Sequence, residues 1–327
     1  MLIKDKIFLP VDTVEKITIA DSFVVRSNKL GSGNGESKFY IGNDGETLRG
    51  FYGKSGFSDK CFFLKKDLIT FLTDLKAEYL SPQLPYKKKD ELPDLFYSRL
   101  KKISALPTII WFSIKDQTQI AGPRVYINST DENYQLIREL ALPNLSYLSL
   151  LKLFSQVDGE IIYQARLFTD FMDSFGVTAH PGEAIKEIDR IEASTNLSQD
   201  QKYQTVKARV GQGKYRKQLL EECPFCPITL VSDDRLLIAS HIKPWAASEQ
   251  HEKIDSKNGF MFTPTIDYLF DQGFITFEDN KQLIVSPWLS KSTISRLNIK
   301  PKIIISQLPI TGREKYLNYH RSIIFKG

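Results

Sequence analysis

The sequence contains few of the features that would place it in a membrane or in an oxidising compartment. Only 3 of its 327 residues are cysteines, too few for a disulfide framework. No stretch approaches the roughly 18 apolar residues of a membrane span, and the N-terminus lacks the apolar run and cleavage site of a signal peptide. We therefore expect a cytoplasmic protein with no membrane partner.

Strong charge and nucleotide-binding patterns are also missing. The formal net charge of +5 is only mildly basic and alone does not indicate a nucleic-acid partner. The glycine-rich segment 29–38 lacks the Lys-Ser/Thr ending of a phosphate-binding loop, so we expect no nucleotide cofactor. Apolar residues make up 42% of the chain, enough for a substantial core.

The first half of the chain alternates strand-like and helix-like segments, which predicts an α+β domain. Segments rich in β-branched and aromatic residues predict strands at 15–26, 37–42, 108–114 and 123–128. Apolar residues at helical spacing predict helices at 64–80, 133–142, 145–154 and 160–176.

The second half begins with more charged helical patterns, expected at 184–195 and 196–209. We therefore divide the chain into an α+β domain, a helical connector and a C-terminal domain. Their expected bounds are 1–155, 156–200 and 201–327.

A basic block precedes the most informative part of the chain. Residues 201–220 hold six Lys or Arg side chains and no acid. Such a block can grip phosphates, although a solvated helix face has the same composition. Within it and beyond it, we expect DNA contacts from Lys207, Arg209, Lys214, Arg216, Lys217, Lys243 and Arg321.

The segment 236–273, "LLIASHIKPWAASEQHEKIDSKNGFMFTPTIDYLFDQG", predicts a strand, a loop, a second strand and a helix. His241 lies at or near the end of the first strand, and Asn258 opens the second. Pro264 is favoured at the first position of a helix, and Gly273 is expected to terminate it. Taken alone, His241 is better interpreted as a hydrogen-bonded structural histidine.

Two aspartates occupy one face of the expected helix. Asp267 and Asp271 are four residues apart, which places their Cβ atoms about 5–6 Å from each other. Two like charges repel unless a positive group lies between them. A divalent cation such as Mg²⁺ or Mn²⁺ and a basic side chain are both candidates.

This arrangement resembles the HNH nucleases, the ββα-metal family, and is closest to the branch found in bacterial restriction-type endonucleases. The resemblance rests on "VGQGKYRKQLL" at 210–220, "LLIASHIKPW" at 236–245, "NGFMFTPTIDYLFDQGFITF" at 258–277 and "YHR" at 319–321. It covers about residues 200–327. The first half of the chain shows no such resemblance.

The resemblance implies a role for each matching residue. His241 would be the general base that activates water, Asn258 would hold the loop and orient the histidine, and Asp267 would bind a catalytic Mg²⁺ or Mn²⁺. Asp271 falls where some members place a further metal-binding histidine. Phosphodiester hydrolysis would leave a 5′-phosphate and a 3′-hydroxyl.

Two positions depart from the family pattern. Many members carry Asp or His immediately before the base, where this chain has Ser240, a poor ligand for a hard divalent ion. Many also hold a structural zinc between two Cys-x-x-Cys pairs, but Cys223 and Cys226 have no second pair. With His251 as a donor a zinc site remains possible, while reduced core thiols are favoured.

We expect a DNA endonuclease of restriction type, acting on double-stranded DNA as a homodimer. The unexplained first half is expected to select a short sequence or a modified base, which could be flipped out of the stack. A nicking or repair nuclease with the same site is one alternative. A catalytically inactive HNH-fold DNA-binding protein is another, and Ser240 keeps it open.

Overall fold

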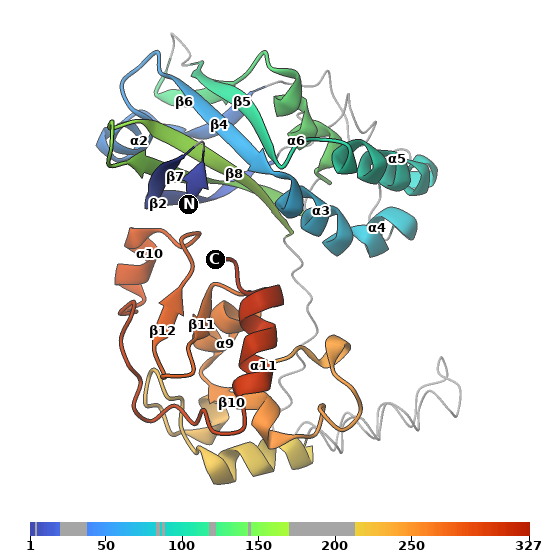
Figure 1. Ribbon diagram of the computed structural model, residues 1–327, viewed down its shortest axis with the longest axis vertical. Helices are drawn as coiled ribbons and strands as arrows, with labels where there is room; N and C mark the ends of the chain where they lie inside the picture. The colour runs from blue at the N-terminus through green and yellow to red at the C-terminus, as the bar shows by residue number, and fades with distance from the viewer. Residues whose placement is uncertain are drawn as a thin grey trace. The chain divides into compact units, whose positions relative to one another are not determined.

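The computed structural model describes residues 1–3, 5–19, 38–82, 86, 89–117, 122–142, 145–169 and 213–327. The chain forms two compact units, one of Met1–Ser174 with Pro287–Ser292 and one of Phe175–Ser286 with Thr293–Gly327. Both contain helices and strands (Figure 1), which confirms the expected mixture of α and β structure. No described helix is long and apolar enough to cross a membrane.

The first unit is built on a sheet whose described strands run in the order β1-β2-β7-β8-β4-β5-β6-β3. Neighbouring strands are antiparallel except for the parallel pair of β4 and β8. The strands are β1 (Leu2–Ile3), β2 (Lys6–Thr18), β3 (Phe39–Asn43), β4 (Ser58–Leu64), β5 (Ile109–Asp116), β6 (Arg124–Asn128), β7 (Ser146–Ser155) and β8 (Ile161–Thr169).

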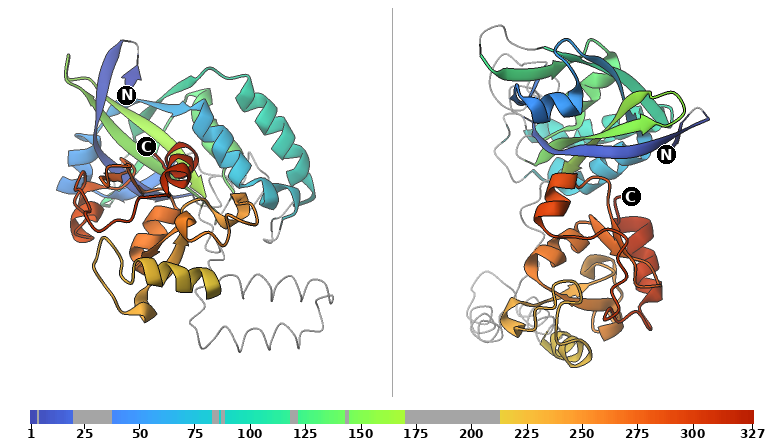
Figure 2. Two further views of the ribbon diagram at one scale, coloured as in Figure 1. Left: turned by 60° about the horizontal axis from the view of Figure 1, so that its bottom comes forward. Right: turned by 90° about the vertical axis from the view of Figure 1, so that its left-hand side faces the viewer.

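Helices lie along one side of this sheet (Figure 2). The longest are α3 (Lys65–Asp74) and α5 (Leu92–Ser104), and the short helix α4 (Lys76–Leu80) lies between them in the chain. Shorter elements are α2 (Glu46–Tyr52), α6 (Gln135–Leu140) and the 3-10 turns η1 (Lys89–Glu91) and η2 (Glu132–Tyr134). The helix predicted at 64–80 is confirmed as the consecutive pair α3 and α4, and α6 confirms the helix expected within 133–142.

Along β5, buried side chains alternate with more exposed ones, and the two sets lie on opposite faces of the sheet. Ile110, Phe112 and Ile114 belong to the core that the helices cover. Because successive side chains of a strand point to opposite faces, Trp111 and Ser113 lie on the other face. The strands predicted around 37–42, 108–114 and 123–128 are therefore confirmed by β3, β5 and β6.

The helices predicted at 145–154 and 160–176 are wrong over the described residues. Residues 146–155 form β7 and residues 161–169 form β8, which pair with each other in the middle of the sheet. Most of β7 is buried, so its apolar residues form a nearly continuous run that periodicity cannot distinguish from a buried helix.

The corrected strand β8 also changes the expected domain boundary. Residues 156–169 close a hairpin and complete the sheet of the first unit, instead of starting a helical connector. The turn uses Gly159 at φ 73°, a conformation that glycine adopts at little cost. The helices expected at 184–195 and 196–209 lie outside the described residues, as do Lys207 and Arg209.

The second unit carries the predicted strand, loop, strand and helix. Strand β9 (Ile238–His241) pairs antiparallel with β10 (Gly259–Phe262), and helix α9 (Pro264–Asp271) follows. Residues 213–222 are helical. The remaining elements are β11 (Ile275–Phe277), β12 (Leu283–Val285), α10 (Lys291–Arg296), α11 (Glu314–Tyr319), the π-helical turn η6 (His320–Ile324) and the 3-10 turns η3 (Asp234–Leu236), η4 (Trp245–Ala247) and η5 (Ser256–Asn258).

Helix α9 begins and ends where the sequence predicts. Pro264 occupies its first turn. At the other end the N–H of Gly273 donates to the carbonyl of Phe270 and that of Phe274 donates to the carbonyl of Leu269, the paired bonds of a Schellman motif. Gly273 has φ 69°, and a Cβ there would overlap the carbonyl oxygen of Ile324. The prediction that Gly273 terminates this helix is thus confirmed, both by its positive φ and by the lack of space for a Cβ.

Candidate active site

His241 ends strand β9 directly opposite Gly259 of β10. Its Nε2 lies 3.0 Å from the carbonyl oxygen of Lys253. Because a carbonyl can only accept, Nε2 must carry the proton. Burial lowers the pKa of His241 from the ordinary 6.5, so the ring is neutral at pH 7. The lone pair of a neutral imidazole with this tautomer is on Nδ1.

Two aromatic side chains fix the plane of this imidazole. The Tyr215 ring stacks on it with centroids 4.2 Å apart and planes 15° apart, and Trp245 meets it edge-on at 5.5 Å. The Tyr215 hydroxyl donates to the carbonyl of Asn258 at 2.9 Å. A Cβ on Gly259 would overlap that hydroxyl, so glycine is required opposite the histidine.

Asn258 is fully buried and holds the loop between the two strands. Its Nδ2 donates to the Ser248 hydroxyl at 3.2 Å and to the Glu252 carbonyl at 3.1 Å, while its Oδ1 accepts from the backbone N–H of Lys243 at 2.8 Å. The same loop supplies the Lys253 carbonyl that orients His241. Asn258 therefore positions the imidazole through the loop, without touching it.

Asp267 faces the strand that carries the histidine. Burial, together with the charge of Asp271, raises the pKa of Asp267 to about 6, against the opposing influence of the Ser240 hydroxyl. Desolvation also raises the pKa of Asp271, although that side chain still reaches solvent. Among the described residues, neither carboxylate forms an ion pair with Lys or Arg.

This carboxylate pair fits a divalent cation in its chemistry. Asp267 and Asp271 supply hard oxygen donors, and a cation would relieve the repulsion that raises the pKa of Asp267. No group of three or more His, Cys, Asp or Glu side chains in the described ranges could hold a metal. The other ligands would have to be water or phosphate oxygens, as Mg²⁺ commonly retains.

Three of the predicted DNA-contacting side chains are engaged within the unit itself. Arg216 donates to the carbonyls of Leu237 and Asp234 at 2.6 and 2.5 Å. Lys243 pairs with Glu252 at 2.5 Å, and Arg321 donates to the Phe277 carbonyl at 2.8 Å and to Asp279 at 3.0 Å.

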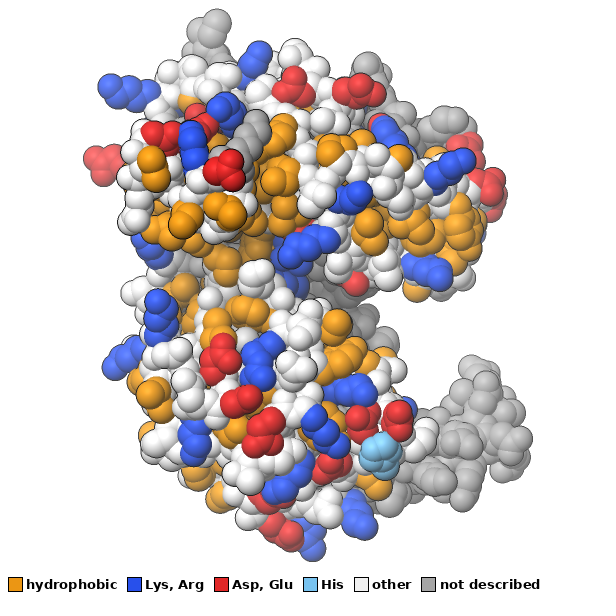
Figure 3. Space-filling model, in the orientation of Figure 1, with side chains coloured by type: hydrophobic (Ala, Val, Ile, Leu, Met, Phe, Trp, Pro, Cys, Tyr) orange, Lys and Arg blue, Asp and Glu red, His pale blue; other side chains and the backbone are white. Residues whose placement is uncertain are grey.

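Lys214 and Lys217, by contrast, are exposed. On the face drawn in Figure 3, acidic and basic side chains of the second unit are interspersed. That face therefore does not present a broad surface of one sign.

Arg313 is a positioning residue that the sequence analysis missed. It is almost fully buried, and its guanidinium donates to the Gly259 carbonyl at 2.9 Å, to Glu222 at 2.8 Å and to the Ser256 carbonyl at 3.3 Å. Hydrogen bonds from Ser256, Arg313 and Lys257 outweigh partial burial and lower the pKa of Glu222 to about 2. No local spacing in the sequence points to this long-range contact.

The two candidate zinc ligands are buried free thiols. The Cys223 thiol donates to the Phe225 carbonyl at 3.3 Å, and Cys226 accepts from the Thr263 hydroxyl at 3.9 Å. The side chain of His251 is 70% exposed and lies 3.5 Å from Glu249. Within the described residues these groups do not come together as a set of three metal ligands.

Residues 226–278 match the model of the HNH endonuclease family, and this range includes β9, β10 and α9 with His241, Asn258, Asp267 and Asp271. No curated protein matches the chain. The chain thus carries an HNH domain in its second unit, which supports a nuclease with DNA as its class of substrate and the divalent metal that such nucleases usually use.

Proposed function

We propose that this protein is a metal-dependent DNA endonuclease of restriction type. The observation that carries the proposal is the hydrogen bond from Nε2 of His241 to the Lys253 carbonyl, which assigns the proton to Nε2. A partly buried, neutral imidazole with its lone pair on Nδ1 is suited to act as a general base at neutral pH. The match to HNH endonucleases supports this role.

In the proposed reaction, Nδ1 of His241 accepts a proton from the water that attacks the scissile phosphate. Tyr215 and Trp245 hold the ring in one plane, and Asn258 holds the loop whose carbonyl fixes the tautomer. Asp267 and Asp271 would hold the divalent cation, which when bound polarises the phosphate and stabilises the leaving oxygen. The products would be a 5′-phosphate and a 3′-hydroxyl.

We assign DNA selection to the first unit, because an HNH domain contacts mostly phosphates, which position a protein without specifying sequence. A nuclease that spares its own genome needs a reader, and the first unit, with its eight-stranded sheet, is the other compact unit among the residues that the structure describes. Cutting both strands with one site per chain favours a two-fold symmetric homodimer. These assignments extend the nuclease proposal.

One observation favours a second candidate, a DNA-binding protein that does not cut. Ser240 stands where many HNH enzymes have a metal ligand, and it is buried close enough to Asp267 for its hydroxyl to lower the pKa of that carboxyl. The site therefore has one carboxylate or imidazole ligand fewer than in those enzymes. In that case DNA binding would be the same with Mg²⁺ as with EDTA.

The deciding experiment uses the full chain, its His241→Ala variant and a matched His251→Ala control. His251 is an exposed histidine of the same unit that has no role in the proposed site. Each protein is incubated with unmodified or cytosine-modified DNA in Mg²⁺, Mn²⁺ or EDTA, and the DNA ends are sequenced. We expect metal-dependent cutting by the unaltered chain and the control, and cutting slowed about 10²–10⁴-fold in His241→Ala.

Each other outcome has a definite meaning. Cutting by His241→Ala at the rate of the unaltered chain would refute the assignment of the base. Binding without cutting in any metal would favour the inactive binding protein. Cutting of modified DNA alone would assign the first unit as a reader of the modification.

A further inference from the structure

A pocket of about 600 Å³ lies within the first unit. This volume is within the range of small-ligand sites, about 300–1,000 Å³. The lining comes from β1, β2, β4, β5, β8 and the η2 region. All of these elements belong to one compact unit, so the pocket exists independently of the nuclease site. It opens on the face of β5 that carries Trp111 and Ser113, opposite the helix-covered core.

One part of the pocket is aromatic and apolar. Trp111 is partly exposed there, and the buried ring of Phe62 lies against it with centroids 5.0 Å apart. Ile3, Phe8 and Ile162 add buried apolar surface. A flat ligand can stack on a supported indole, and base–aromatic stacking contributes about 1–3 kcal/mol per base.

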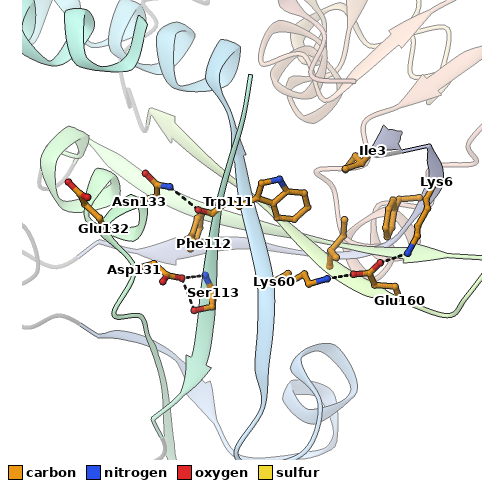
Figure 4. Close-up of a pocket in the computed structure, with 12 residues that line it drawn as sticks. Ile3, Lys6, Lys60, Trp111, Phe112, Ser113, Asp131, Glu132, Asn133 and Glu160 are labelled. Atoms are coloured by element: carbon orange, nitrogen blue, oxygen red, sulfur yellow. Dashed lines mark hydrogen bonds and ion pairs between the residues drawn. The ribbon is translucent and has the colours of Figure 1, made fainter. Parts of the chain in front are cut away.

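The other part presents hydrogen-bond acceptors. Asp131 accepts from the backbone N–H of Ser113 and from its hydroxyl at 2.7 Å. A carboxylate has about four lone-pair sites, so Asp131 can still accept from a ligand. Asn133 donates its Nδ2 to the Trp111 carbonyl at 2.9 Å, which fixes the amide with Oδ1 as an acceptor. Figure 4 shows both acceptors to one side of Trp111.

The charges of the lining argue against an anionic ligand. Lys6 and Lys60 both bind Glu160, at 3.0 and 2.6 Å, and Lys6 also pairs with Asp158. The lysines are thus neutralised by carboxylates. The five ionisable lining residues, Lys6, Lys60, Asp131, Glu132 and Glu160, together have one more negative charge than positive. A phosphate would be repelled, whereas a neutral ring with N–H donors would not.

We propose that this pocket binds a single nucleobase with an exocyclic amino group, stacked on Trp111 and donating to Asp131 and Asn133. Adenine, cytosine and guanine meet this description, and thymine does not. The proposal deepens the assignment of DNA selection to the first unit, on which it rests. The base can come from DNA, extruded from the duplex, or from a free nucleoside that acts as an effector.

The test measures binding in EDTA, so it does not depend on cleavage. Calorimetric titrations of the full chain use deoxyadenosine, deoxycytidine, deoxyguanosine and thymidine. A second set uses duplex DNA with one base opposite an abasic position, where extrusion costs least, and a matched duplex. The variants are Trp111→Ala, Trp111→Phe and Asp131→Asn, with Tyr97→Ala as control. Tyr97 is a 59% exposed aromatic residue of the same unit, outside the pocket.

We expect the amino-bearing nucleosides to bind more tightly than thymidine. Trp111→Ala should weaken binding about 5- to 150-fold, Trp111→Phe should restore much of it, and Tyr97→Ala should change nothing. Asp131→Asn should remove the preference for amino-bearing bases. Circular dichroism and thermal unfolding of each variant identify any loss that comes from misfolding.

The outcomes separate the two sources and the two proposals. Trp111-dependent tighter binding of the abasic-opposed duplex assigns an extruded base. Nucleoside binding without that duplex preference assigns a free effector. Equal binding of thymidine, or equal behaviour of Trp111→Ala and Tyr97→Ala, overturns the pocket proposal. A chain that binds in this way but never cuts DNA overturns the nuclease proposal and leaves the pocket standing.

Discussion

Two histidines of the second unit, the partly buried His241 and the buried His320, have similar surroundings. Each places Nε2 against a backbone carbonyl, at 3.0 Å from Lys253 for His241 and at 2.9 Å from Phe270 for His320. Each stacks on an aromatic ring, Tyr215 at 4.2 Å and Phe270 at 3.9 Å. Burial lowers both pKa values, that of His320 to about 4. Burial and stacking therefore do not identify a reactive imidazole.

The two rings differ at Nδ1. The Thr276 hydroxyl lies 2.9 Å from Nδ1 of His320 and donates to it, since Nε2 already carries the proton. In the described part of the chain no hydrogen bond reaches Nδ1 of His241. One histidine thus has both nitrogens occupied by the fold, and the other keeps one lone pair for a ligand. The proposed difference in function between the two histidines therefore depends on whether Nδ1 already accepts a hydrogen bond.

Replacing each histidine by alanine should give opposite results, and this is the largest effect we expect. His241→Ala should lower the cleavage rate by about 10²–10⁴-fold, the range of general-base catalysis, with a smaller loss of stability than His320→Ala because the ring is only partly buried. His320→Ala should lower the free energy of unfolding by about 2–4 kcal/mol through a core cavity and two lost hydrogen bonds. Single-turnover cleavage and urea denaturation measure the two effects. A stable His320→Ala protein with no activity would show that His320 is not merely structural.

The next largest effect concerns the acid beside the reactive histidine. The folded-state pKa of Asp267, about 6, is above the ordinary 3.8. The protonated form therefore stabilises the fold fully below the unfolded value, and this contribution is lost as pH rises through 6. In metal-free protein at pH 8, Asp267→Asn should gain about 1–3 kcal/mol.

A bound divalent cation should instead make the ionised form of Asp267 the one that stabilises the fold. Mn²⁺ or Mg²⁺ should raise the thermal unfolding temperature of the unaltered chain more at pH 8 than at pH 5, and should not raise that of Asp267→Asn. Asp234→Asn, an exposed acid of the same unit, is the control. An unfolding temperature that no cation moves at either pH would count against the metal site.

Tyr215 allows the stacking contribution to be separated from the hydrogen bond. Tyr215→Phe keeps the ring and loses the bond to the Asn258 carbonyl, so it should cost about 0.5–1.5 kcal/mol and leave the pH profile of cleavage unchanged. Tyr215→Leu removes the stack and admits water. The pKa of His241 should then rise toward 6.5, moving the acid limb of the profile to higher pH, with a rate loss on the order of tenfold. Identical profiles for the two variants would exclude a positioning role for the ring.

The smallest effect on cleavage comes from making His320 resemble His241. Thr276→Val removes the hydroxyl at Nδ1 and leaves a buried acceptor without a partner, which should cost about 1–3 kcal/mol of stability. Cleavage per folded molecule should be unchanged. Thermal unfolding and active-site-normalised rates test this, and a variant as stable as the unaltered chain would show that water replaces the hydroxyl.

Local signals explain what could be predicted from the sequence. Pro264 and Gly273 set the ends of α9 through conformational preferences that act within a few residues. The strand ending at His241 and the strand opened by Asn258-Gly259 were similarly marked by breakers and apolar runs. The ββα order, and with it the HNH match, therefore followed from short segments.

Features that depend on distant packing could not be predicted. Strand β7 was mistaken for a helix because the sheet buries both its faces, a property of the assembled unit. Arg313 reaches Gly259 across 54 residues, and the stacking of Tyr215 on His241 joins residues 26 positions apart. The raised pKa of Asp267 likewise comes from burial that the helix pattern alone does not reveal.

The buried Asn258 also has a consequence for how the protein ages. An asparagine followed by glycine is chemically fragile, because the next backbone nitrogen can attack the side-chain amide and convert it to aspartate or isoaspartate. Here the amide is held by three donor contacts and one acceptor contact, and Gly259 is extended in a strand. The folded structure should therefore slow deamidation of Asn258. Deamidation should occur only when this region unfolds locally. The fraction of protein deamidated at Asn258 should therefore measure how often the region has opened.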